Sequence, residues 1–174
     1  MRFRILSAAI AAALATAFAA YTPASAHVVL DTREAPAGSY YKAVFRVPHG
    51  CGGSPTTAIA VTLPDGILSA KPQPKPGWTL AVERQALPQP VAGPHGSTVT
   101  ERVARIAWSG GDLPDAWFDE FAIQVRLPDA APGTVIRFPV EQTCAVGSRH
   151  WVGTGETKAD PAPALRLTAG HARH

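Results

Sequence analysis

The chain has 174 residues, of which 46% are apolar and 17% are charged, and its formal net charge is +3. This length suits one domain with a single sizeable core. The small net charge gives no sign of a nucleic-acid partner, and no segment after residue 26 is long and apolar enough to span a membrane.

The first 26 residues have the pattern of a secretory signal peptide. Arg2 and Arg4 precede the apolar stretch Ile5–Ala20, whose length of about 16 residues falls short of the roughly 20 that a spanning helix needs. The small residues Ala-Ser-Ala at 24–26 then offer a cleavage site. We expect cleavage between Ala26 and His27, which would leave a periplasmic or secreted protein of net charge near +1.

Strand patterns follow one another along the rest of the chain, separated by turn residues. They cover residues 27–31, 40–47, 57–63, 78–84, 99–108, 118–127 and 134–140, with a last strand expected around Trp151 and 165–167. Pro139 lies near the end of one pattern, which favours an edge strand or a strand that ends there. Since no helical period occurs after residue 26, the sequence predicts a single-domain, all-β sandwich, with a barrel as the alternative.

The chain has two cysteines, Cys51 and Cys144. An even count in an exported protein predicts a disulfide. Closing a loop of about 92 residues would stabilise the fold by about 4–5 kcal/mol. A two-thiolate metal site is the alternative.

Cleavage before His27 would place two nitrogen donors on one residue, the free α-amine and the imidazole Nδ1. Both can bind one metal ion and close a six-membered ring. Cu(II) has the highest affinity in the divalent series and prefers a tetragonal N,O geometry. An α-amine has a reference pKa of about 8, so giving up its proton at neutral pH costs only about 1 kcal/mol. The alternative is a histidine that begins a strand by chance.

Several uncommon strings occur in a specific order after residue 26. They are HVVL at 27–30, APAGSYYKAVFRVPHGCGGSPT at 35–56, KPQPKPGW at 71–78, IAWSGGDLPDAWFDEF at 106–121, FPVEQTCAVGSRHW at 138–151 and PAPALRL at 161–167. Through them, residues 27–168 resemble the YcnI-like family of exported copper-binding proteins. The resemblance implies an immunoglobulin- or cupredoxin-like β-sandwich. It also implies Cu(II) held by a mono-histidine brace at His27, with Trp151 beside the metal as a shield or an oxidisable group.

The carboxylate expected in such a site departs from the family pattern. Many relatives have an acidic residue after the second cysteine, where this chain has Ala145, and a Glu two residues after the tryptophan, where it has Gly153. Glu156 is therefore one candidate metal ligand. Glu120 is another, because strand alternation should place one residue of the Asp119–Glu120 pair inward. The ordinary alternative for Glu120 is a salt bridge to an arginine such as Arg102 or Arg105.

Other histidines and aromatic residues receive weaker roles. His49 is a possible second copper ligand, although a hydrogen-bonded loop histidine is the ordinary interpretation. His150 should face away from Trp151, because successive strand residues alternate. We expect His95 at an exposed turn, and His171 and His174 in a flexible tail over residues 169–174. We expect Trp78 and Trp108 in the core. Trp117 and Phe118 should line an edge or a partner surface.

Together these patterns predict an exported Cu(II)-binding protein that is not an enzyme. It would act as a carrier, metallochaperone or buffer in copper homeostasis, with a membrane copper transporter or another periplasmic copper protein as its partner. One alternative is a copper-dependent, monooxygenase-like redox enzyme, which would require a second inward histidine. The other is a β-sandwich interaction domain without a metal. The sequence contains no nucleophile elbow, zinc-binding helix or phosphate loop.

Overall fold

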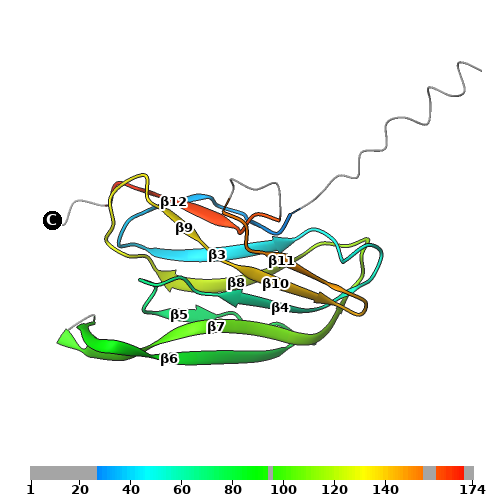
Figure 1. Cartoon of the computed structure of the whole chain (residues 1–174), viewed down its shortest axis with the longest axis horizontal. Helices are drawn as coiled ribbons and strands as arrows, with labels where there is room; N and C mark the ends of the chain where they lie inside the picture. The colour runs from blue at the N-terminus through cyan, green and yellow to red at the C-terminus, as the bar shows by residue number, and fades with distance from the viewer. Residues whose placement is uncertain (1–26, 94–95, 155–159, 171–174) are drawn as a thin grey trace, which may run out of the picture.

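The computed structural model describes residues 27–93, 96–154 and 160–170, which form three β-sheets (Figure 1). The four-stranded sheet has the order β1 (Val29–Leu30), β3 (Tyr40–Val47), β8 (Asp119–Arg126), β5 (Ala70–Pro72). The five-stranded sheet has the order β11 (Ser148–Trp151), β10 (Val140–Cys144), β4 (Thr56–Thr62), β7 (Thr98–Leu113), β6 (Thr79–Ala92). The third sheet has the order β2 (Glu34–Pro36), β12 (Ala164–Thr168), β9 (Val135–Arg137). The expectation of an all-β fold is confirmed.

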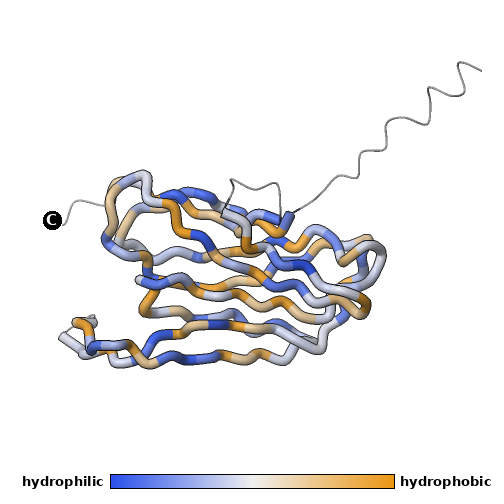
Figure 2. Tube along the Cα trace, in the orientation of Figure 1, coloured by the Kyte–Doolittle hydropathy of each residue, from blue (hydrophilic) through white to orange (hydrophobic). Residues whose placement is uncertain are grey.

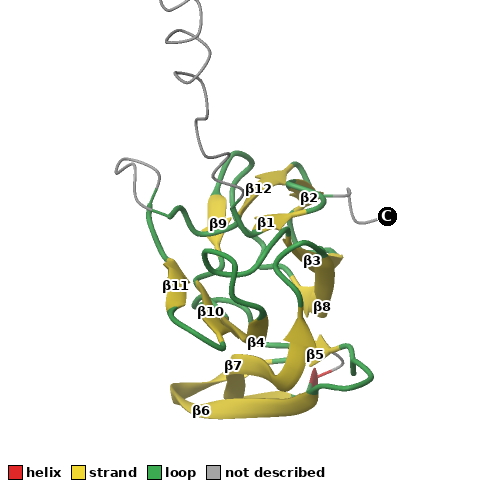
Figure 3. Ribbon diagram, turned by 90° about the vertical axis from the view of Figure 1, so that its right-hand side faces the viewer, coloured by secondary structure: helices red, strands yellow, loops and turns green. Residues whose placement is uncertain are grey.

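The core is formed by buried residues of all three sheets, whose arrangement Figure 3 shows. In β3 the buried residues are Tyr41, Ala43, Phe45 and Val47, with more exposed residues between them, and Figure 2 shows hydrophobic and hydrophilic residues alternating along the strands. Phe121 of β8 meets Trp108 of β7 with ring centroids 5.4 Å apart. This contact joins the inner faces of the two sheets, as expected of a sandwich. Among the described residues, none belongs to a helix of the length and hydropathy needed to cross a bilayer.

The expected single strand over residues 134–140 is wrong, because the chain changes sheets there. β9 pairs with β12, whereas β10 pairs with β4 and β11. The break falls at Phe138 and Pro139, where proline has no N–H for a ladder. The Phe138 ring is buried against Phe45, with centroids 5.6 Å apart. The expected last strand is likewise two strands in different sheets, β11 and β12.

The β6–β7 hairpin is longer than the patterns at 78–84 and 99–108 predict, and it extends past the neighbouring strands in Figure 1. Pro88 and Pro90 lie within β6. They are tolerated because β6 is an edge strand, and the pairing with β7 shifts register between Ala86 and Val91.

Candidate metal centre

His27 directly precedes β1 and is held in place by its neighbours. Val28 is buried, and Val29 pairs with Arg46 of β3. His27 is itself partly exposed and lines a hollow of about 280 Å³. Residues 161–164, which lead into β12, also line this hollow. The predicted N-terminal residue of the mature chain therefore lies in a surface recess rather than in the core.

Trp151 ends β11 and packs beside His27. The ring centroids of the two side chains are 5.4 Å apart, and their planes meet at 59°. Trp151 is only 2% exposed, because its side chain lies on the inner face of the sheet beside the buried Val140, its pairing partner in β10. The fold thus brings together the two residues that the sequence singles out most strongly, from opposite ends of the domain.

The polar end of Trp151 is anchored by a buried amide. The indole Nε1–H donates a hydrogen bond of 3.1 Å to Oε1 of Gln142, which is 1% exposed. Nε2 of Gln142 donates to the His49 carbonyl and to Thr56 Oγ1, both at 2.8 Å. Sequence reasoning missed Gln142 and Thr56. Gln142 could have been found from its position, since it lies two residues after Val140 and two before Cys144. Alternation along a strand places all three side chains on the same inward face.

Cys51 and Cys144 form a disulfide with an S–S distance of 2.03 Å and a Cα–Cα distance of 6.0 Å. The expectation of a disulfide is confirmed, and a two-thiolate metal site is ruled out in this oxidised form. Thr56 Oγ1 lies 3.8 Å from Cys144 Sγ. The disulfide is therefore the next neighbour of the amide that holds Trp151.

Of the pair Asp119 and Glu120, the partly buried Asp119 lies on the inner face at the start of β8, and Glu120 lies on the exposed face, so Glu120 is not the inward residue. Asp119 Oδ1 accepts a hydrogen bond from Lys75 Nζ at 2.7 Å, and the half-exposed Glu120 pairs with Arg46 at 3.8 Å. The same alternation places Phe121, two residues after Asp119, in the core. The arginines considered as partners of Glu120 form other pairs: Arg102 with Asp65, and Arg105 with Glu83 and Glu141.

The other candidate ligands are placed as follows. Glu156 lies outside the described residues, as do His95, His171 and His174. His49 Nδ1–H donates to the Gly50 carbonyl at 2.5 Å. His150 is exposed, on the strand face opposite that of the buried Trp151, as the sequence predicts. Over the part of the chain that the structure describes, no three His, Cys, Asp or Glu side chains form a group that could hold a metal ion.

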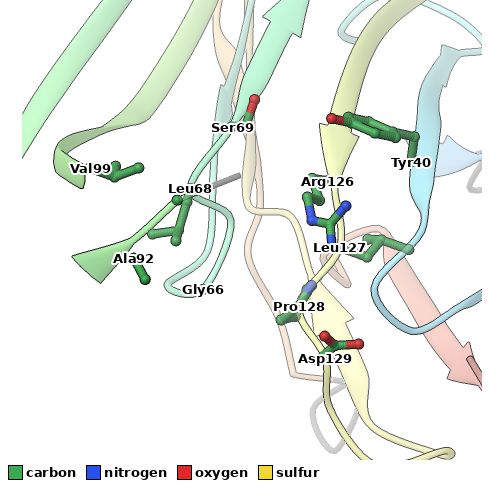
Figure 4. A pocket seen from close by; sticks show the side chains of 11 residues that line it. Tyr40, Gly66, Leu68, Ser69, Ala92, Val99, Arg126, Leu127, Pro128 and Asp129 are labelled. Atoms are coloured by element: carbon green, nitrogen blue, oxygen red, sulfur yellow. The ribbon is translucent and has the colours of Figure 1, made fainter. Parts of the chain in front are cut away.

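A larger hollow, of about 650 Å³, lies away from His27 (Figure 4). Its lining includes Tyr40, Leu68, Val99 and Arg126. Tyr40 begins β3, whereas β1 and His27 lie along the other end of that strand. The two hollows are therefore separate sites.

Comparison with known proteins identifies the class of fold to which the chain belongs. The chain is 31% identical to an uncharacterized protein from Nocardia farcinica whose crystal structure reveals an immunoglobulin-like fold, over 82% of this chain and 98% of that one, with a TM-score of 0.60. The predicted immunoglobulin-like architecture is thus confirmed. Residues 27–167 match the family described as "Domain of unknown function (DUF1775)", and the chain belongs to this family.

A curated relative connects the family to copper. The chain is 24% identical over 111 residues to the copper-binding protein CutI of Bacillus subtilis (strain 168). The match covers 63% of this chain and 47% of CutI, so the chain spans about half the length of this relative. The resemblance to the YcnI-like copper-binding family is confirmed as a distant homology.

Proposed function

We propose that the mature protein binds one Cu(II) ion through the α-amine and imidazole Nδ1 of His27, and that it acts outside the cytoplasm as a carrier, metallochaperone or buffer in copper homeostasis. The observation that carries the proposal is the position of His27. It lies at the expected cleavage point, lines a surface hollow and packs against Trp151. The distant homology to a copper-binding protein supports the choice of metal.

The donor set fits copper better than a metal that needs several side chains. The described residues offer no cluster of three ligating side chains, but a terminal histidine supplies two nitrogens by itself. Amine and imidazole nitrogens are donors that suit Cu(II). Water and one carboxylate would complete the shell.

Glu156 and Glu120 are the two candidates for that carboxylate. Glu120 already has an ionic partner in Arg46, so we favour Glu156. Each is replaced by glutamine, and Cu(II) affinity is measured by competition with a chelator of known affinity. Replacing the glutamate that binds the copper should weaken binding at least tenfold, and replacing the other glutamate should leave the affinity unchanged. Wild-type affinity in both variants would exclude a role for either carboxylate.

The histidines described around the site favour a carrier over an enzyme. A two-histidine oxidative centre needs a second imidazole on the same ion. Among the described residues, His27 is the one histidine that lines the hollow, and His150 is exposed on the face away from Trp151. The copper form mixed with a reductant and oxygen should therefore reduce oxygen no faster than the same amount of copper held by a simple peptide. Faster turnover would favour the enzyme alternative.

The decisive experiment moves the α-amine without changing any side chain. The mature protein that begins at His27 is compared with a variant that carries one extra alanine before it, and both are titrated with Cu(II). We expect tight 1:1 binding in the first and its loss in the second, because the amine leaves the chelate ring. His150→Ala is the matched control, since it removes an exposed histidine near the site and should bind as the wild type does. Equal affinity with and without the extra alanine would disprove the brace.

Mass spectrometry of the exported protein tests the same proposal in the cell. The expected mass corresponds to a chain that starts at His27. Any other first residue would contradict the proposal, because His27 would then lack a free amine.

A further inference from the structure

We propose that Gln142 is a positioning residue of the metal centre, which fixes the indole of Trp151 against His27 and ties that orientation to the Cys51–Cys144 disulfide. The inference rests on the proposed copper site at His27. It extends that site into the core, to residues that neither the sequence patterns nor the comparisons single out.

The orientation of the Gln142 amide is dictated from both of its ends. The indole Nε1–H of Trp151 can only donate, so the amide atom that faces it must be the carbonyl oxygen Oε1. The backbone carbonyl of His49 can only accept, so the atom that faces it must be Nε2. The two requirements agree, and a flipped amide would lose both bonds.

The chain of hydrogen bonds continues to the disulfide in one direction. Thr56 Oγ1 accepts a hydrogen bond from Gln142 Nε2, which leaves the threonine proton available. Cys144 Sγ lies 3.8 Å away and carries no hydrogen in the disulfide, so Thr56 is the donor of that weak bond. In every step from the indole to the sulfur the donor is therefore the partner nearer to Trp151.

Burial makes this arrangement rigid. Thr56 and Gln142 are the buried polar side chains of the described core, and both are almost fully shielded from water. A buried polar group that loses its partner bears the full cost of desolvation, so each bond in the chain holds the next in place. Trp151 is thereby fixed at its Nε1 atom, and this fixes the orientation in which the indole packs against His27.

The test uses Gln142→Met, which keeps the length of the side chain and removes its polar atoms. The matched control is Glu141→Gln, on the neighbouring residue of β10, whose side chain pairs with Arg105 on the other face. The sequence has four tryptophans, so the indole N–H signals of protein labelled with ¹⁵N-tryptophan are few, and Trp151→Phe identifies the signal of Trp151.

Three results are expected for Gln142→Met in the mature protein. The Trp151 indole N–H exchanges with solvent at least about tenfold faster before copper is added, because its acceptor is gone. Affinity for Cu(II) falls about tenfold, and the broadening of the Trp151 signal by one equivalent of Cu(II) changes from that of the wild type. Glu141→Gln alters none of these. If Gln142→Met does not fold, Thr56→Val replaces it and should produce changes in the same direction, about threefold in affinity, because the amide loses one of its anchors.

The outcomes separate the two proposals. A wild-type protein that binds no Cu(II) overturns the proposed function and this inference together. If the wild type binds Cu(II) and Gln142→Met shows the same affinity and the same broadening, the positioning role alone is overturned. That conclusion holds even if the variant unfolds more easily, because the loss of a merely structural residue would have that effect.

Discussion

The imidazole of His27 and the indole of Trp151 lie with their ring centroids 5.4 Å apart, although one residue precedes the first strand and the other ends the eleventh. A Cu(II) ion held by His27 would therefore lie close to an aromatic ring that the protein keeps out of water. If copper binds at His27 as proposed, Trp151 is an internal reporter of the metal.

Cu(II) quenches the fluorescence of a nearby indole, so one equivalent of Cu(II) should quench part of the emission of the mature protein. We expect Trp151→Phe to abolish this stoichiometric quenching. Trp117→Phe should preserve it, because Trp117 is 65% exposed in the loop between β7 and β8. Quenching that survives in Trp151→Phe would place the copper elsewhere.

The disulfide should contribute much of the stability of the fold. Replacing Cys51 and Cys144 by serine removes a link between residues 93 positions apart. We expect a fall of about 4 kcal/mol in the free energy of unfolding, because the unfolded chain gains the freedom of a long open loop. Urea denaturation of the oxidised wild type and the double variant measures the difference. A loss below about 1 kcal/mol would show that the native packing, and not the crosslink, restrains these loops.

Tyr41 should make the protein sensitive to high pH. Burial, aided by the negative charge of Asp31, raises the pKa of Tyr41 from 10.0 to about 12, and its hydroxyl donates to the carbonyl of Thr32. The unfolded chain loses this proton first. The stabilisation is therefore complete below about pH 10 and is lost as the pH rises to about 12.

The measurement compares unfolding by urea at about pH 8.5 and about pH 11.5, where the Tyr41 contribution to the loss should be about 2 kcal/mol. Tyr41→Phe should be less stable at the lower pH by about 1 kcal/mol, because it lacks the hydrogen bond, and should lose less on going to high pH. Tyr40→Phe is the control, since Tyr40 is exposed. An equal loss in all three proteins would mean that Tyr41 does not titrate as described.

Gly111 should not tolerate a side chain. A Cβ atom there would lie 2.0 Å from the ring of Trp78, which packs edge-on against Phe121 with centroids 5.0 Å apart. We expect Gly111→Ala to lower the free energy of unfolding by about 1–3 kcal/mol, the usual cost of overpacking. In a Trp78→Ala background the same substitution should cost clearly less, and a double-mutant cycle measures this coupling. Additive effects would show that the two residues do not restrain each other.

The strands that the sequence predicts well are those with one buried face. Residues 40–47 alternate strictly, and the structure has β3 at Tyr40–Val47. β2 and β5 have three residues each and contain proline, so no period could be recognised in them. The exchange of sheets at Phe138–Pro139 also has no local signature, because it depends on which distant strands compete for each half of the segment.

The candidate site divides in a similar way. His27, Trp151 and the two cysteines could be singled out because their chemistry is distinctive and the resemblance pointed to them. Gln142 and Thr56 have ordinary side chains whose role arises only when three strands are in register: Gln142 pairs with Arg149 on one side and with Ile59 on the other. Alternation alone could not say which of Asp119 and Glu120 lies inward. Asp119 shares the face of the buried Phe121, whereas Glu120 lies on the exposed face and pairs with Arg46.

The parallel pairing of β12 with β2 has a consequence for the order of assembly. Leu167 lies beside Ala35, and residues just before β12 form part of the wall of the recess at His27. An emerging polypeptide cannot build that wall until Thr168 has been made and has returned to the beginning of the domain. The recess at His27 is thus completed late in folding, after the two ends of the domain have met.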